Sequence, residues 1–279
     1  MQEKSFFFPG SSGNLFGVLH TPGEQKTKKC GFVFCAPFAE EKLWSHRVYT
    51  NFARKLAGHG YTVLRFDYLG HGDSDGEFRD TTVDSRIIDI KSALHTLRQE
   101  GAVEDVGLLG LRFGATLAAL VAEETSVCKL ILWGPVLNGA QYMKTLIRTN
   151  ISTQISVFKE VRDSSSALVE KLRSFRDPII IEGYEITLPL YEQIVSIDLL
   201  STEKKFTGDV LLLDIVKKEG MENEKMKLFE QMYPHITIGP VVEKQFWKEI
   251  REYYYSADNL FESTLNWMEN KYELNSSND

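Results

Sequence analysis

The sequence predicts an α/β fold with a mostly parallel central sheet, flanked by helices and carrying an inserted cap. Short apolar runs alternate with segments of helical spacing from residue 30 to about 139, and the alternation resumes at 209. Such alternation is typical of strand–helix–strand units whose strands lie parallel. The stretch between them breaks the pattern with polar amphipathic segments. We therefore predict a core formed by 1–139 and 206–279, and a cap over 140–205.

Local patterns define the first elements. The strand-like runs Ser5–Pro9 and Asn14–His20 flank a Gly-Ser-Ser-Gly turn, which favours a hairpin. The continuous apolar run Cys30–Ala36 is typical of a strand buried on both faces. In Leu43–His59 the apolar residues repeat every four positions, and glycines end the helix that this spacing predicts.

The next elements lead to a sharp turn. Tyr61–Phe66 is a predicted strand, and Asp67–Phe78 is too rich in glycine and aspartate to be anything but a loop. Val83–Glu100 carries apolar residues on one helical face. A strand, a turn and a helix are predicted over 106–125, and Lys129–Pro135 is the following strand.

The cap and the second half are less regular. The cap contains a serine-rich stretch, Asp163–Ser166, that we expect to be mobile, and a β-rich piece, Ile179–Leu188. The elements expected after it are a strand over Asp209–Ile215, a helix over Met221–Met232, a strand over His235–Gly239 and a long final helix over Phe246–Tyr272.

Composition narrows the class of protein. The chain has 279 residues and a net charge of −7, which argues against broad nucleic-acid binding because that needs a basic face. No apolar stretch reaches the roughly 20 residues of a membrane span. The first residues lack the apolar core of a signal peptide, and three cysteines form no spaced framework. We therefore expect a cytoplasmic protein with reduced thiols.

The turn at 110–114 reads Gly-Leu-Arg-Phe-Gly and places Arg112 between a strand and a helix. A Gly-x-X-x-Gly turn in this context is a nucleophile elbow, whose central residue is normally a serine. A guanidinium has no lone pair with which to attack. At a helix amino terminus it could bind a carboxylate or phosphate, or it could form a salt bridge to Glu40 or Glu41. Both alternatives stay open.

The other members of a catalytic triad are also missing. A triad needs a histidine after the last strand, and none follows His235, which stands at the start of that strand before its apolar run. With no base to orient, Asp214 and Glu219 are predicted to be solvated loop carboxylates. Cys35 lies in an apolar run and is predicted to be a buried, inert thiol. We assign no catalytic residue.

A polar loop at a strand end offers further candidates. Asp67, His71, Asp73 and Ser74 lie where open α/β sheets bind ligands. His71 could act as an acid or base, or could simply hold loop backbone by hydrogen bonds. The acidic residues do not have the spacing of a calcium loop, so no metal is predicted. The aromatic residues at 246–255 favour helix packing over a sugar-binding platform.

Several of these motifs together resemble a known family. The segments APFAEE, Asp-x-x-Gly-x-Gly-Asp-Ser and Gly-Leu-Arg-Phe-Gly-Ala are similar to α/β-hydrolases of the serine-aminopeptidase-like group, in particular the exosortase- and exopolysaccharide-associated hydrolase-like proteins. The resemblance spans roughly residues 30–250. It implies the α/β-hydrolase fold, and it implies that an arginine at the elbow is usual for this subgroup.

We therefore predict a protein that binds an acidic small molecule or a polymer end in a capped pocket, without serine-triad catalysis and without a cofactor. The residues expected around the ligand are Arg112, Phe38, Glu40, Glu41, Asp67, His71, Asp73 and Ser74. Two alternatives remain: an ester or amide hydrolase with a non-standard nucleophile, and a non-catalytic interaction module. The oligomeric state is not predicted.

Overall fold

The central sheet has eight strands, in the order β1-β2-β4-β3-β5-β6-β9-β10. The computed structural model describes residues 1–23, 27–158, 164–201, 204–221, 223–248 and 253–276. The strands are β1 (Gln2–Pro9), β2 (Asn14–Thr21), β3 (Cys30–Cys35), β4 (Thr62–Phe66), β5 (Asp105–Leu111), β6 (Lys129–Trp133), β9 (Asp209–Val216) and β10 (Ile236–Val242). Among these eight strands β2 alone runs opposite to the others, and the predicted hairpin of β1 and β2 is confirmed.

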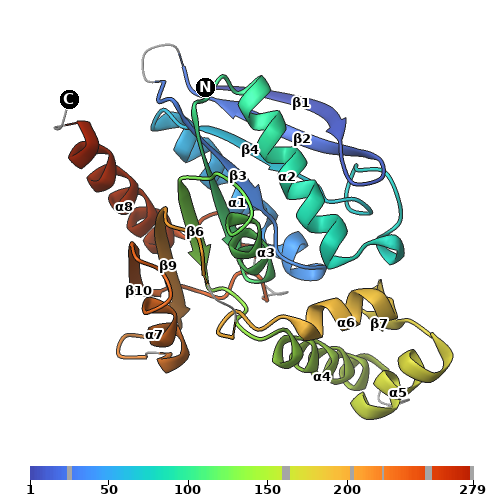
Figure 1. Ribbon diagram of the computed structural model, residues 1–279. Helices are drawn as coiled ribbons and strands as arrows, with labels where there is room; N and C mark the ends of the chain where they lie inside the picture. The colour runs from blue at the N-terminus through green and yellow to red at the C-terminus, as the bar shows by residue number, and fades with distance from the viewer. Residues whose placement is uncertain (24–26, 159–163, 202–203, 222, 249–252, 277–279) are drawn as a thin grey trace.

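Helices cover both faces of this sheet (Figure 1). Helices α1 (Glu40–Gly58) and α8 (Asp258–Ser276) cover one face, and α2 (Val83–Glu100) and α3 (Phe113–Ala122) cover the other. Successive side chains of β3 point to opposite faces of the sheet and so enter both cores. Phe32 and Phe34 pack in the core under α1, whereas Val33 and Cys35 pack in the core under α2 and α3. The predicted α/β-hydrolase fold, with its mostly parallel sheet, is confirmed. Among the described residues, no helix has the length and apolar character needed to cross a bilayer.

The segment between β6 and β9 forms a separate group of elements. It contains α4 (Gly139–Phe158), α5 (Ser165–Phe175), β7 (Ile179–Ile181), β8 (Tyr184–Ile186) and α6 (Leu188–Ser196). Figure 1 shows this group beyond the end of the sheet to which β6 and β9 point. It is tied to the core where the Gln193 side chain accepts a 2.7 Å hydrogen bond from the Val83 amide, at the start of α2. Asp163, in the serine-rich stretch, lies outside the described residues.

The predicted long final helix begins 12 residues too early. Helix α8 begins at Asp258, and the described part of the segment before it is irregular, with a turn at Phe246. Phe246 and Trp247 are both buried, although successive side chains of a helix point about 100° apart. The chain turns here so that both aromatic rings reach the core. Helix α7 (Glu224–Glu230) is shorter than predicted, and β10 extends three residues past the predicted end at Gly239.

Candidate functional site

The turn between β5 and α3 holds Arg112 in a strained conformation. Its φ is 55° and its ψ is −124°, a region that non-glycine residues rarely adopt. Two glycines make the turn possible. A Cβ on Gly110 would lie 2.5 Å from backbone atoms of Ala115, and one on Gly114 would collide with the carbonyl oxygens that follow β3. The two glycines are therefore required by the close approach of α3 to β3 and β5.

The Arg112 side chain lies between a carboxylate and two aromatic rings. Its Nε is 3.5 Å from Oε1 of Glu41, and its Nη1 is 3.4 Å from the Gly134 carbonyl oxygen. The guanidinium carbon is 5.3 Å from the ring centroid of Trp247 and 5.8 Å from that of Tyr142. The two polar contacts are long, so they leave the guanidinium with donor capacity for a further acceptor.

Glu41 is placed by a second strained residue. Ala39 has a φ of 49° and turns the chain into α1, so that Glu40 and Glu41 occupy the first turn of that helix. Glu41 is buried, and its Oε2 accepts a 2.8 Å hydrogen bond from the Tyr142 hydroxyl. Glu40 is only partly buried, and burial raises the pKa of its carboxyl group. Of the two expected partners of Arg112, Glu41 therefore makes the ion pair.

A pocket of about 320 Å³ opens beside Arg112, at the carboxyl ends of β6 and β9. Tyr142, Trp247 and Asp214 contribute to its wall. The prediction that Asp214 is a solvated loop carboxylate is wrong, because Asp214 lies within β9 and is partly buried. Burial raises the pKa of Asp214, and the nearby charge of Arg112 opposes that rise. Glu219, in contrast, is exposed as expected.

An aromatic residue from the segment after the last strand lies beside Arg112. The segment after β10 brings Trp247 onto Arg112, and no histidine occurs among the described residues that line the pocket. His235 immediately precedes β10, which runs parallel to β9. It therefore lies at the opposite edge of the sheet from Arg112, which follows the carboxyl end of β5. Cys35 is fully buried, and burial raises the pKa of its thiol far above the ordinary value, as expected of an inert cysteine.

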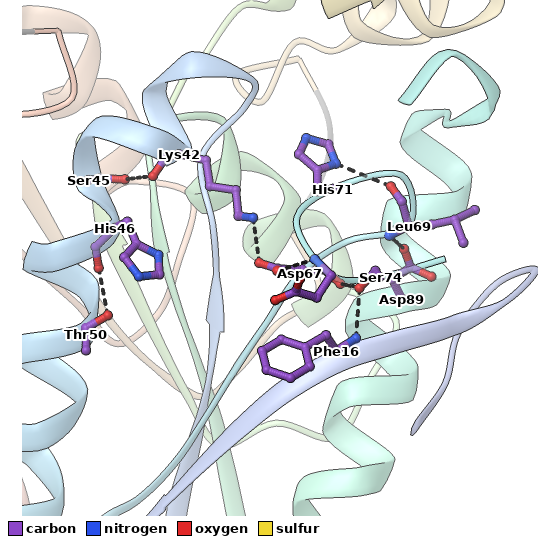
Figure 2. A network of polar contacts seen from close by, with 11 residues as sticks. Phe16, Lys42, Ser45, His46, Thr50, Asp67, Leu69, His71, Ser74 and Asp89 are labelled. Carbon is purple, nitrogen blue, oxygen red and sulfur yellow. Dashed lines mark hydrogen bonds and ion pairs between the residues drawn. The ribbon is translucent and has the colours of Figure 1, made fainter. Parts of the chain in front are cut away.

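The loop after β4 forms its own network (Figure 2). Lys42 extends from α1 to Asp67, with 2.5 Å between Nζ and Oδ1, and Asp67 also accepts the Asp73 amide at 3.2 Å. Ser74 donates to the Asp67 carbonyl at 2.6 Å and accepts the Phe16 amide at 2.8 Å. A Cβ on Gly72 would overlap the Asp67 carboxylate. These contacts hold the loop on α1 and β2. The described lining of the Arg112 pocket includes none of the three predicted loop residues Asp67, Asp73 and Ser74.

His71 connects this loop to the inserted segment. Its Nδ1 is 3.3 Å from the Leu69 carbonyl oxygen, and its ring contacts Phe78 and, at 6.1 Å between centroids, Tyr184 of β8. Burial, together with the charge of Arg86, lowers the pKa of His71 well below the ordinary value. The imidazole is therefore neutral near pH 7 and contacts loop backbone at the Leu69 carbonyl, and its part in acid–base chemistry stays a prediction. Phe78 in turn contacts Phe38, whose ring also meets Phe113 and Tyr142.

Three pocket residues were missed or misjudged from the sequence. Tyr142 lies in α4, where only an amphipathic pattern was visible, and Trp247 was assigned to helix packing. Asp214 was set aside because no histidine accompanied it. A usable signal existed for Trp247 alone, because it follows the last strand at the place where a base is expected.

Comparison with known proteins agrees with this fold. The family model described as serine aminopeptidase, S33, matches residues 42–185, which is about half of the chain. No curated protein sequence matches it.

Solved structures of the same fold cover nearly the whole chain. An α/β serine hydrolase homologue from Coxiella burnetii superposes with a TM-score of 0.56 at 19% identity, over 88% of this chain and 91% of that one. Est1E from Butyrivibrio proteoclasticus, solved with ferulic acid, gives 0.60 at 17% identity over 88% and 92%. Mouse α/β-hydrolase domain-containing protein 10 gives 0.59 at 16% identity over 97% and 98%. At such identities the likeness establishes the fold alone.

Proposed function

Because the chain belongs to the serine aminopeptidase S33 family of α/β-hydrolases, we propose that it uses the family's pocket to bind an anion through Arg112 and not to attack an ester or amide. The ligand is an acidic small molecule or the acidic end of a polymer. The observation that carries this proposal is the identity of the elbow residue. Arg112 occupies the turn with the strained backbone of a nucleophile, but its side chain can only donate hydrogen bonds.

The contacts of Arg112 support an anion site. Its 3.5 Å contact with Glu41 is long, and its side chain keeps 22% of its surface exposed, whereas that of Glu41 keeps 8%. A ligand carboxylate can therefore approach the open side of the guanidinium while Glu41 stays on the buried side. Helix α3 begins at the next residue, so its amino end adds a favourable field for negative charge.

The neighbouring elements give this pocket a cover. The inserted segment supplies Tyr142 to the pocket wall and Tyr184 to the ring contacts around His71. We propose that 140–205 acts as a cap that limits entry to Arg112. We also propose that a set of residues outside the pocket lining supports the site, namely Glu40, Asp67, His71, Asp73 and Ser74. The Pro-Phe-Ala-Glu-Glu loop and the arginine elbow favour the exosortase- and exopolysaccharide-associated subgroup. A cytoplasmic location is a separate proposal, which rests on the cysteine pattern and the polar first residues.

Binding to a matched pair of probes tests the proposal. D-Galacturonate carries a carboxylate, and D-galactose is its uncharged counterpart. Isothermal titration should show saturable binding of galacturonate that is at least tenfold tighter than that of galactose. Arg112→Gln, which keeps a long polar side chain, should remove this preference. Equal binding of the two sugars by the wild type, or an unchanged preference in Arg112→Gln, would refute the anion site.

A further inference from the structure

A second pocket adjoins the one at Arg112. It encloses about 560 Å³ at the carboxyl ends of β9 and β10, and Lys217, Lys244 and Lys248 line it. Gln245 lines both pockets, so the two adjoin along one edge of the sheet. Tyr254 adds an aromatic face, with the Lys244 ammonium 5.1 Å from its ring centroid.

The charge at this edge differs from that of the rest of the protein. The described linings of the two pockets contain five cationic side chains and two carboxylates, although the whole chain carries a net charge of −7. The cations are Arg112, Lys217, Lys225, Lys244 and Lys248. Concentration of positive charge in a concave site on an acidic protein raises the local concentration of anions.

Lys248 interacts electrostatically with cations of both pockets. Desolvation lowers the pKa of its ammonium group, the charges of Arg112 and Lys217 lower it further, and only Glu41 acts in the opposite direction. Lys248 is thus close enough to Arg112 and Lys217 to be repelled by both. An anion bound between them would relieve that repulsion, as it would at any cluster of like charges.

We propose that the pocket defined by Lys217, Lys244 and Lys248 is a subsite for a second anionic group of the ligand that Arg112 binds. The ligand is therefore an oligoanion, such as a chain of acidic sugars, with one charged group at Arg112 and another at the lysines. This inference rests on the proposed function, because it takes Arg112 as the first anchor. Two linked contacts raise affinity through effective concentration without any new kind of interaction.

The test compares a monomer with a trimer of the same acid. Titration of D-galacturonate and trigalacturonate into the wild type should give an affinity at least tenfold higher for the trimer. Maltotriose, an uncharged trimer, should not show this gain. Lys217→Gln/Lys248→Gln should reduce the ratio of trimer to monomer affinity to about twofold or less. Lys29→Gln/Lys91→Gln removes the same charge from ion pairs elsewhere on the surface and should keep the wild-type ratio.

The outcomes separate the two proposals. If the wild type prefers galacturonate to galactose but binds monomer and trimer equally, the second subsite is wrong and the anion site stands. The same conclusion follows if the Lys217→Gln/Lys248→Gln variant keeps the wild-type ratio, or if the control pair loses it equally. If Arg112→Gln leaves binding of galacturonate unchanged, the proposed function itself fails.

Discussion

The Tyr142 hydroxyl donates a 2.8 Å hydrogen bond to Glu41, the same carboxylate that pairs with Arg112. The ion pair at the elbow is therefore held from two directions, by α1 of the core and by α4 of the inserted segment. Because Tyr142 is itself buried, movement of α4 would leave Glu41 without this partner. The link makes the geometry of Arg112 depend on the position of the inserted segment.

Tyr142→Phe should destabilise the protein by about 1–3 kcal/mol, because the buried Glu41 carboxylate loses a hydrogen bond while the packing of the ring is kept. Urea unfolding measures the change. Tyr255→Phe is the matched control: its ring is 59% exposed, and its loss of a hydroxyl should change the free energy of unfolding by less than about 0.5 kcal/mol. Equal effects of the two substitutions would argue against a structural role for the contact between Tyr142 and Glu41.

Gly114→Ala should destabilise the fold by about 2–3 kcal/mol or more, because the added methyl group meets the backbone carbonyls of Cys35 and Ala36. Gly58→Ala serves as the control. A Cβ at Gly58, at the end of α1, has no neighbour within 4 Å, and alanine there should stabilise the protein by up to about 1 kcal/mol. Thermal unfolding of both variants gives the comparison. Tolerance of Gly114→Ala would mean that α3 does not approach β3 as closely as described.

Short p-nitrophenyl esters should not be hydrolysed above the background rate. A triad gains its rate from a coupled nucleophile and base, and the described lining of the Arg112 pocket contains no serine, cysteine or histidine. Arg112→Ser should not create activity, because no histidine is available to accept the proton. An esterase rate that one substitution in the pocket abolishes would favour the alternative of a non-standard nucleophile.

Stability should fall as the pH decreases below 6.5, and His71→Phe should reduce that dependence. Burial lowers the pKa of His71 well below 6.5 and that of His20 to about 4, so the unfolded chain takes up protons first as the pH falls. For each of these histidines, this proton uptake lowers the free energy of unfolding by up to about 1.4 kcal/mol per pH unit. Urea unfolding between pH 6.5 and 5 should show a shallower slope in His71→Phe. His235→Gln, an exposed position, should keep the wild-type slope.

The strands and helices of the core were predictable because their patterns depend on local spacing. The helix over Val83–Glu100 was predicted with both of its ends, since a threonine caps its start and a glycine follows its last residue. The strand β3 was equally clear as a continuous apolar run. The Gly-Leu-Arg-Phe-Gly turn was recognisable because steric contact fixes both of its glycines.

The pocket was less predictable because it is made by long-range contacts. Tyr142 is 101 residues from Glu41 in sequence, and nothing local marks it as a partner. Trp247 looked like part of a long helix because the aromatic residues around it also suit helix packing. Asp214 was set aside as a loop carboxylate, although it pairs with Pro240 of β10 inside the sheet, a contact that its local sequence does not mark.

The most direct measurement is the NMR signal of the Arg112 side-chain Nε–H group, assigned by its absence in Arg112→Gln. If the guanidinium is the anion contact, titration with D-galacturonate should shift this resonance saturably, and D-galactose should not move it. The shift should follow the same binding curve as isothermal titration. Saturable binding of galacturonate without any change in the Arg112 signal would contradict the central claim that Arg112 binds the anion.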